Sequence, residues 1–443
     1  MTDINVDQLV HTAVFGDGDA KAAARRTIHM EARRRGAVSS SIYPFYMALG
    51  RNDIRNEIER PFTVPAFNIR ALTYDATRAL FRAAMRHDAG AFIFEIARSE
   101  IGYSEQRPGE YAACVLAAAL REGFEGPVFI QGDHFQASAK KWATEEGRAA
   151  EMKALESLIN EALAAEFYNI DIDTSTLVDL DFPTRDEQQR ANYEGTAHLT
   201  KYIRARQPDG ITVSVGGEIG EVGKYNTHPE EVRAYADGLK RLLGSTTGIS
   251  KISVQTGTSH GGVPLADGTI AQAKIDFDVL RETTRICREE YGMAGSVQHG
   301  ASTLPESVFN RFPEAEAVEI HLATGFQNMI LDAPTLPPEI RDGIRDFCFE
   351  HCLDERKPGQ TDEQFVYTSR KKALGSFKRR MWEMAATAKD PIVHDLEAKF
   401  EFLMEKLGVF GTKDIVARYV KATPNEMPAY AAASAELTAA AVV

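Results

Sequence analysis

The sequence is poor in cysteine and has no excess of positive charge. The first shortage bears on the redox compartment of the protein, and the second on its binding partners. Its four cysteines have neither zinc-ribbon nor redox spacing: Cys114, Cys287, Cys348 and Cys352. Such sparse usage is typical of a reducing cytoplasm. The formal net charge is −13, from 64 acidic against 51 basic residues. Because nucleic acids and anionic membranes bind positive surfaces, we expect neither as a partner.

Long apolar runs are missing as well. No stretch approaches the roughly 18 uninterrupted apolar residues of a membrane span, and the first residues contain no apolar signal core. Residues 21–35 are basic enough to suggest a transit peptide, but Asp17, Asp19 and Glu31 argue against one. We interpret this segment as a solvated helix and expect a cytoplasmic protein.

What the sequence does have is a regular alternation of two kinds of segment. Eight β-rich runs are spaced along the chain: 62–69, 91–96, 127–131, 167–173, 211–218, 249–256, 295–299 and 317–322. Helical stretches rich in Ala, Leu, Glu and Arg lie between most of them: 75–86, 110–122, 151–165 and 230–243. Buried strands that alternate with amphipathic helices predict an α/β fold, and eight such units close into a (β/α)8 TIM barrel. Two doubly wound domains are the alternative, but no Gly-rich dinucleotide fingerprint follows the first run.

The pattern predicts four parts of the chain. They are an N-terminal helical extension (1–60), the catalytic barrel (61–331), a C-terminal helical extension (332–423) and an Ala-rich tail (424–443) for which disorder is the default. The charged helices beyond Leu331, including 363–384 and 392–407, are typical of packing or oligomer helices. We therefore expect a homo-oligomer.

Polar residues stand at the carboxyl ends of the predicted strands, the face at which a barrel enzyme builds its active site. Every run ends in an ionisable or polar side chain: Asn68, Glu95, Asp133 with His134, Asp173, Glu218, His260, His299 and Thr324. A purely structural role gives no reason for such a placement at every strand end. We therefore predict that the functional site lies there.

Three of these residues are histidines in related contexts. His134 ends Gln-Gly-Asp-His, His260 precedes two glycines, and His299 opens His-Gly-Ala-Ser. One such histidine alone is more often a hydrogen-bonded core residue. Three at three strand ends favour a catalytic metal site, because neutral imidazole is the commonest Zn²⁺ ligand and three protein ligands leave a position open.

Several short segments also carry a resemblance to a known family. They are Val64–Asn68, Gly132–His134, Ile172–Ser175, Glu218–Gly220, Gly257–Gly261, His299–Ser302 and Leu322–Thr324. In these segments the chain resembles the class II, zinc-dependent ketose-bisphosphate aldolases, which include fructose- and tagatose-1,6-bisphosphate aldolases. The Asp-His pair and the His-Gly-Ala-Ser segment are the specific ones.

The resemblance implies a metal centre with acid and base groups beside it. His134, His260 and His299 would ligate Zn²⁺ or another divalent metal, and a monovalent cation can accompany it. Asp133 would be the acid that protonates the aldehyde oxygen, and Glu221 is a guess for the base that moves the C3 proton.

The resemblance also implies the residues around the metal and the substrate. Asp173 and Glu218 would orient the metal ligands or hold the metal in an alternative position. The candidate substrate-binding residues are Asn68, Glu95, Gly261, Gly300, Ser302, His321 and Thr324. Among them, the two glycines, the serine and the threonine match loops that bind the ketose 1-phosphate.

The implied reaction is the reversible cleavage of a ketose 1,6-bisphosphate, or a close analogue, to dihydroxyacetone phosphate and an aldehyde. Its chemistry needs an electron sink at the C2 carbonyl, which a divalent ion supplies without a lysine Schiff base. It also needs a proton donor near the aldehyde. The field of the cation should lower the pKa of Asp133, so this residue would start ionised and act as a shuttle. Backbone amides of Gly-rich loops would bind the phosphate.

The chain departs from the family pattern in the barrel interior and in one loop. Gln131 replaces a histidine, and Gly216 replaces the first glutamate of a Glu-x-Glu pair. The loop 221–227 is shortened and lacks an acidic cluster. Glu319 and His321 stand where the family usually has Lys and Asn. His321 either replaces the asparagine that steadies the enediolate or simply packs, and the two interpretations are about even.

Two other functions remain as alternatives. Glu95 followed by Arg98 and Ser99 also resembles the larger subunit of tagatose-bisphosphate aldolases, a non-catalytic stabilising subunit, but the three histidines favour an enzyme. A metal-dependent hydrolase on the same barrel ranks last, because residues 67–69 lack the His-x-His of such enzymes. Basic groups at 370–372 and 378–380 are candidates for the distal phosphate, although such charge runs usually form a solvated face.

Overall fold

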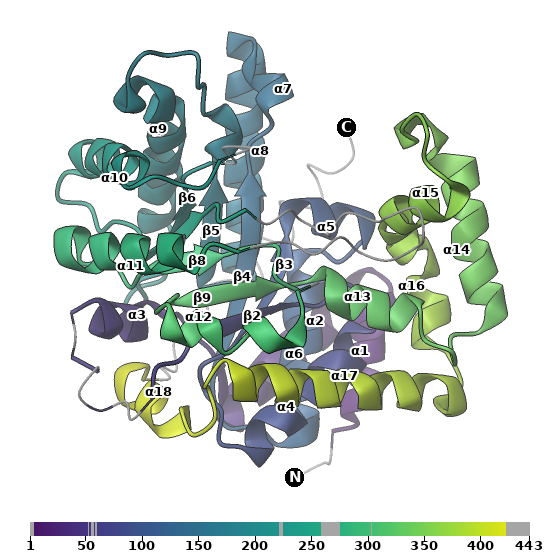
Figure 1. The fold of residues 1–443 in the computed structure, drawn as a ribbon. Helices are drawn as coiled ribbons and strands as arrows, with labels where there is room; N and C mark the ends of the chain where they lie inside the picture. The colour runs from purple at the N-terminus through teal and green to yellow at the C-terminus, as the bar shows by residue number, and fades with distance from the viewer. Residues whose placement is uncertain are drawn as a thin grey trace.

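The computed structural model describes residues 4–51, 53–54, 57, 60–220, 225–257, 275–302 and 304–421. Eight parallel strands form a closed barrel at its centre (Figure 1): β2 (Val64–Asn68), β3 (Ile93–Ala97), β4 (Gly126–Gln136), β5 (Asn169–Asp173), β6 (Ser214–Glu218), β7 (Lys251–Val254), β8 (Ser296–Gln298) and β9 (Glu319–Leu322). Pairing of β9 with β2 closes the barrel. Each of the eight predicted runs overlaps one of these strands. The TIM-barrel prediction is therefore confirmed, and the doubly wound alternative is wrong.

Helices cover the outside of the barrel (Figure 1), and those between the strands are α4 (Thr73–Arg86), α5 (Arg98–Tyr103), α6 (Pro108–Glu122), α7 (Ala139–Trp142), α8 (Glu145–Ala164), α9 (Arg185–Arg204), α10 (Pro229–Leu243), α11 (Phe277–Tyr291) and α12 (Arg311–Glu314). Local chemistry sets their ends. α6 begins at Pro108, which has no N–H to leave unbonded, and ends before Gly123, whose φ is 73°. Thr184 and Glu187 form a capping box that starts α9.

The N-terminal segment contains one strand that the sequence did not predict. β1 (Ala37–Ser39) pairs in parallel with the first residues of β4, outside the barrel. Three residues are too few to show a strand pattern, so a helical lead-in was the natural expectation. The rest is helical: α1 (Val6–Phe15), α2 (Gly18–Arg34) and α3 (Tyr43–Gly50). Ile28 on α2 is fully buried, so this helix is amphipathic rather than solvated all round.

After the barrel, α13 (Thr324–Leu331) leads into the C-terminal helices α14 (Pro338–His351), α15 (Asp362–Ser369), α16 (Leu374–Trp382), α17 (Ala386–Lys406) and α18 (Lys413–Tyr419). Figure 1 shows α14, α15 and α16 grouped on one side of the barrel, while α17 runs along α4. Ion pairs of Arg82 and Arg86 with Glu397, at 2.6 and 2.5 Å, join α4 to α17. The Ala-rich tail lies outside the described residues. No helix among the described residues is long and apolar enough to cross a membrane.

Candidate metal centre

The end of β4 is bent so that two neighbouring side chains enter the mouth of the barrel. The register between β4 and β5 shifts between Gly132 and Phe135, which is a β-bulge. His134 has a φ of 40°, in the left-handed region that non-glycine residues rarely adopt. A Cβ at Gly132 would lie 2.5 Å from the Phe135 ring, so the bend requires glycine there. The Gly-Asp-His sequence therefore encodes the turn that presents Asp133 and His134 to the site.

Two carboxylates from neighbouring strands hold His134. Its Nδ1 atom lies 2.9 Å from Asp173 Oδ2 and 3.1 Å from Glu218 Oε2. Asp173 is fixed in turn, because it accepts hydrogen bonds from the Ser175 amide at 3.0 Å and hydroxyl at 2.6 Å and from Gln136 Nε2 at 2.5 Å. The predicted neighbours of the metal, Asp173 and Glu218, thus both contact a predicted metal ligand.

His299 completes a compact set of ligand-type atoms. It follows β8, its ring centroid lies 4.3 Å from that of His134, and its Nε2 lies 2.8 Å from Ser253 Oγ. One ligand atom each from His134, Glu218 and His299 lie within 4.8 Å of one another. This donor set suits a divalent transition metal. His260, Gly261 and Glu221 lie outside the described residues, so the expected third histidine, one phosphate-binding glycine and the expected base have no position here.

The electrostatics of this set favour a bound cation. Burial and the nearby Asp173 carboxylate raise the pKa of Glu218 to about 7. Burial alone would lower the pKa of His134, but Asp133 and Glu218 outweigh it and raise that pKa well above its usual value. Burial is the first cause for Glu218, but neighbouring carboxylates raise the pKa of both groups, and a divalent ion would neutralise that negative charge.

His321 lies inside the site and contacts its acid. Its Nδ1 is 3.1 Å from Asp133 Oδ1 and 3.0 Å from Glu95 Oε2, and its Nε2 is 2.7 Å from Glu319 Oε1. Its ring centroid is 4.1 Å from that of His299. Asp133, His299 and His321 form a second compact group of ligand-type atoms. Carboxylates face both nitrogens of His321, however, which leaves it better placed as a hydrogen-bond donor to Asp133.

Below these side chains the barrel interior is charged, which sequence reasoning missed. Lys251 on β7 is fully buried, and its Nζ lies 3.0 Å from Asp171 Oδ2, 2.8 Å from Gln131 Oε1 and 2.5 Å from Glu319 Oε1. Tyr46 on α3 donates a hydrogen bond to Glu319 from outside the barrel. The sequence showed Gln131 and Glu319 as departures from the family pattern, but Lys251 and Asp171 carried no signal that they would pair.

Three departures from the family pattern belong to this one network. A Cβ at Gly216 would lie 2.2 Å from Asp171 Oδ1 and 2.9 Å from Lys251 Cε, so glycine makes room for the ion pair. Gln131 links Glu95 and Glu319 through its Nε2, at 3.1 and 3.0 Å. The substitutions at positions 131, 216 and 319 are thus mutually dependent.

The other predicted substrate-binding residues lie around the mouth. Asn68 donates a hydrogen bond of 2.6 Å to Glu100 Oε2, and Glu95 faces His321 from the floor. Gly300 has a φ of 68°, and Ser302 Oγ accepts a hydrogen bond of 3.1 Å from the amide of Gly325, in the first turn of α13. The structure thereby brings Gly300, Ser302 and Thr324 together at the ends of β8 and β9.

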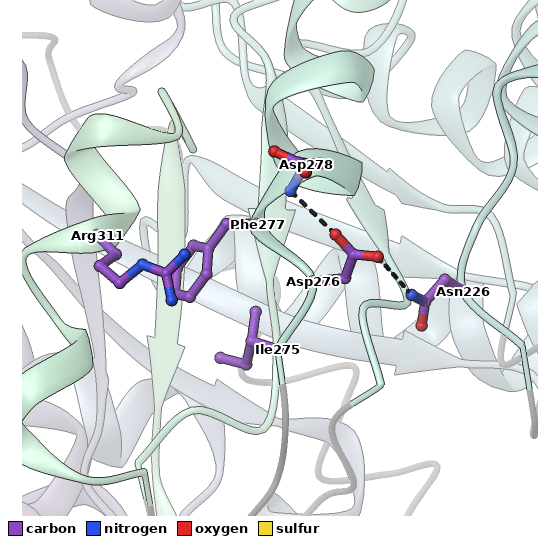
Figure 2. Close-up of a pocket in the computed structure, with 6 residues that line it drawn as sticks. All are labelled: Asn226, Ile275, Asp276, Phe277, Asp278 and Arg311. Atoms are coloured by element: carbon purple, nitrogen blue, oxygen red, sulfur yellow. Dashed lines mark hydrogen bonds between the residues drawn. The ribbon is translucent and has the colours of Figure 1, made fainter.

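A cavity of about 840 Å³ connects these groups. Its wall includes Asp133, His134, His299 and His321, and extends to residues of the C-terminal helices. A second hollow, of about 480 Å³, lies beside the start of α11 (Figure 2). There, Asn226 and the amide of Asp278 both donate hydrogen bonds of 3.1 Å to Asp276. None of the candidate site residues that the structure describes lines this second hollow.

Comparison with known proteins identifies the family of the chain and supports its fold. The profile of the family described as Fructose-bisphosphate aldolase class-II matches residues 54–394. One solved structure is a Sinorhizobium meliloti protein described as a "probable tagatose 6 phosphate kinase". It is 16% identical to this chain with a TM-score of 0.52, and the match covers 85% of this chain and 98% of that protein. Another is the fructuronate-tagaturonate epimerase UxaE from Cohnella laeviribosi, which is 13% identical with a TM-score of 0.51. That match covers 90% of this chain and 86% of the epimerase. At such identities these structures show the shared fold alone. No curated protein matches the sequence.

Proposed function

Because the chain belongs to the class II fructose-bisphosphate aldolase family, we propose that it is a metal-dependent lyase that reversibly cleaves a phosphorylated ketose to dihydroxyacetone phosphate and an aldehyde. The observation that carries this proposal is the convergence of ligand-type atoms of His134, Glu218 and His299, two of which line one cavity with Asp133. Ligand-type histidines and a proton-transfer group within one cavity are what carbon–carbon cleavage with a metal electron sink requires.

The side chains of the site suit a bound divalent ion, and we propose that this ion is zinc. His134 and His299 would hold it, with Glu218 in reach, and His260 is the proposed third histidine. When bound, the ion supplies a Lewis acid for the substrate carbonyl. Asp173 keeps the His134 ring oriented through the 2.9 Å contact to Nδ1, which is the usual role of a carboxylate behind a metal-binding histidine.

Asp133 is the proposed proton-transfer group for the aldehyde oxygen. In the cleavage direction the C3–C4 bond breaks, the C4 hydroxyl gives its proton to Asp133, and C3 gains a proton. In the condensation direction Asp133 returns its proton to the aldehyde oxygen. His321 holds the Asp133 carboxylate from the barrel side at 3.1 Å. Glu221 remains the proposed group for the proton at C3.

The phosphate of dihydroxyacetone phosphate is assigned to the ends of β8 and β9. Gly300, Ser302 and Thr324 lie there, beside the first turn of α13. Backbone amides at strand ends and helix starts bind phosphate in many barrels. In this arrangement the ketone half of the substrate lies between His299 and α13.

Exchange of the C3 proton of dihydroxyacetone phosphate with solvent tests the proposal directly, because it needs the metal and the base but no aldehyde. We expect NMR to show exchange with metal-loaded protein and its loss after chelation. Condensation with a panel of aldehydes then identifies the second half of the substrate. Absence of exchange in metal-loaded protein would favour the non-catalytic subunit instead.

A further inference from the structure

The cavity of about 840 Å³ has one wall that does not come from the barrel. Tyr367, Thr368 and Lys371 line it, and they belong to α15 and the turn that follows it. The C-terminal helices therefore contribute to the site as well as to packing. Because the phosphate of dihydroxyacetone phosphate is assigned beside α13, we place the aldehyde half of the substrate toward this wall.

Most cations in this region already have a carboxylate partner. Arg70 pairs with Glu100 at 2.5 Å, and Arg98 pairs with Glu151 at 2.5 Å. Both neighbours of Lys371 are engaged elsewhere: Arg370 pairs with Asp332, and Lys372 pairs with Glu355. Charge pairing thus removes these groups as free anion binders.

Lys371 differs from all of them. In the part of the chain that the structure describes, its ammonium makes no hydrogen bond or ion pair, and its Nζ lies 5.8 Å from the centroid of the Tyr103 ring. The side chain is half-buried. Burial and the charge of Arg70 lower the pKa of Lys371. Glu100 is an acidic residue that acts on this ammonium, but Glu100 pairs with Arg70 at 2.5 Å. A partly desolvated cation that faces a cavity and has no ion pair of its own among the described residues is stabilised by an anionic ligand.

The number of available donors indicates which anion fits. Each of the three nitrogens of the Arg70 guanidinium already has a partner, which is Glu100, Asn68 at 3.2 Å or Gln327 at 3.2 Å. Thr368 donates its hydroxyl proton to the backbone of its own helix. The three N–H groups of Lys371 remain, with Lys140 exposed to solvent in the same cavity wall. One half-buried ammonium matches a carboxylate of one negative charge better than a phosphate dianion with its larger demand for donors.

We propose that Lys371 binds a carboxylate at the far end of the aldehyde half, so that the substrate is the adduct of dihydroxyacetone phosphate with an aldehyde acid. This inference rests on the proposed function, in that an aldehyde is the second substrate of the condensation. It assigns specificity for that aldehyde to the C-terminal extension rather than to the barrel.

Three acceptor aldehydes that differ only at the far end test the proposal: 3-hydroxy-4-oxobutanoate, glyceraldehyde 3-phosphate and neutral glyceraldehyde. In condensation with dihydroxyacetone phosphate, we expect kcat/KM to be highest for the carboxylate. Lys371→Gln should lower the ratio of kcat/KM for the carboxylate over neutral glyceraldehyde about tenfold or more, as expected for loss of a hydrogen bond to a charged group. Lys371→Arg should restore most of it. Lys372→Gln is the matched control, because Lys372 pairs with Glu355, and should leave the ratio unchanged.

A binding measurement separates this inference from the proposed function. The unreactive 3,4-dihydroxybutanoate is titrated into metal-loaded protein and followed by ligand-observed NMR. We expect Lys371→Gln to weaken its binding about tenfold. That result would uphold the subsite even if no C3 exchange occurred. Equal binding to both proteins, or a higher kcat/KM for glyceraldehyde 3-phosphate than for the carboxylate, would overturn the proposal.

Discussion

Gly216 and Lys251 lie side by side on adjacent strands in the middle of the barrel, and the first leaves room for the second. A Cβ on Gly216 would come within 2.9 Å of Lys251 Cε and within 2.2 Å of Asp171 Oδ1. Lys251 is the ammonium that compensates two buried carboxylates, Asp171 and Glu319. The ion pair in the floor of the site thus depends on the absence of a side chain at Gly216.

We predict that Gly216→Ala destabilises the protein by about 1–3 kcal/mol, the usual cost of overpacking a buried site. The added methyl group must push Asp171 away from Lys251, since both are held between neighbouring strands. Denaturant unfolding measures the change. Gly102→Ala is the control, because a Cβ there meets nothing within 4 Å. A change of less than about 0.5 kcal/mol at position 216, within the range of ordinary surface substitutions, would mean that the barrel floor is loosely packed.

We predict that Lys251→Met costs about 3–5 kcal/mol at neutral pH, because it leaves two buried carboxylates without a counter-charge. Burial raises and Lys251 lowers the pKa of both Asp171 and Glu319. The pKa of Asp171 is already raised to about 6 with the lysine present, and loss of the lysine raises the folded-state pKa of both carboxyl groups further. Protonation of Asp171 therefore favours the fold, and the variant should regain stability as the pH falls.

The control for this prediction is Lys399→Met, which breaks a more exposed pair with Glu306 and should cost less than about 1 kcal/mol. Unfolding curves at pH 5 and pH 8 check both statements. Equal loss of stability at the two pH values would show that the carboxylates are compensated by another group.

The third prediction concerns the metal. His299→Ala should reduce bound zinc from about one ion per chain to a small fraction, because His299 is the histidine that joins His134 in the compact ligand set. Elemental analysis after dialysis against excess zinc measures it, and His198→Ala, an exposed histidine paired with Glu156, is the control. Unchanged zinc content in the His299 variant would remove this site from the proposal.

The sequence predicted most of the barrel because each strand is a buried apolar run with a polar end. The structure also brings Asp133, His134, Asp173, Glu218 and His299 close together, since the carboxyl ends of parallel strands meet at one face. Their roles in a reaction remain predictions. The sequence did not predict β1, whose Ala37–Ser39 is too short to show a period. Nor did it predict the charged interior, because only closure of the barrel decides that Lys251 meets Asp171 and Glu319.

The sequence could not single out Lys371 for a related reason. The basic group at 370–372 was a candidate for the distal phosphate, but its three residues are alike in sequence. The structure separates them, because Arg370 and Lys372 pair with acidic residues while Lys371 faces the cavity. Pairing of this kind depends on which helices pack together, and the local sequence does not contain that information. The homo-oligomer and the cytoplasmic location remain predictions.

The last prediction concerns Asp133, the group assigned to the proton of the aldehyde oxygen. Asp133→Asn keeps the shape of the side chain and can still accept a hydrogen bond from His321, which lies 3.1 Å from Asp133 Oδ1. The amide cannot exchange a proton with substrate, so condensation and cleavage should slow about 10²- to 10⁴-fold, the usual contribution of a general acid–base group. Bound zinc should stay near the wild-type level, and C3 exchange of dihydroxyacetone phosphate should persist, because neither requires this proton.

Asp354→Asn, on the exposed surface, controls for the loss of one charge. Turnover within a factor of about three of the wild type would show that Asp133 is not the group that transfers the proton, since a general acid–base group contributes far more than that.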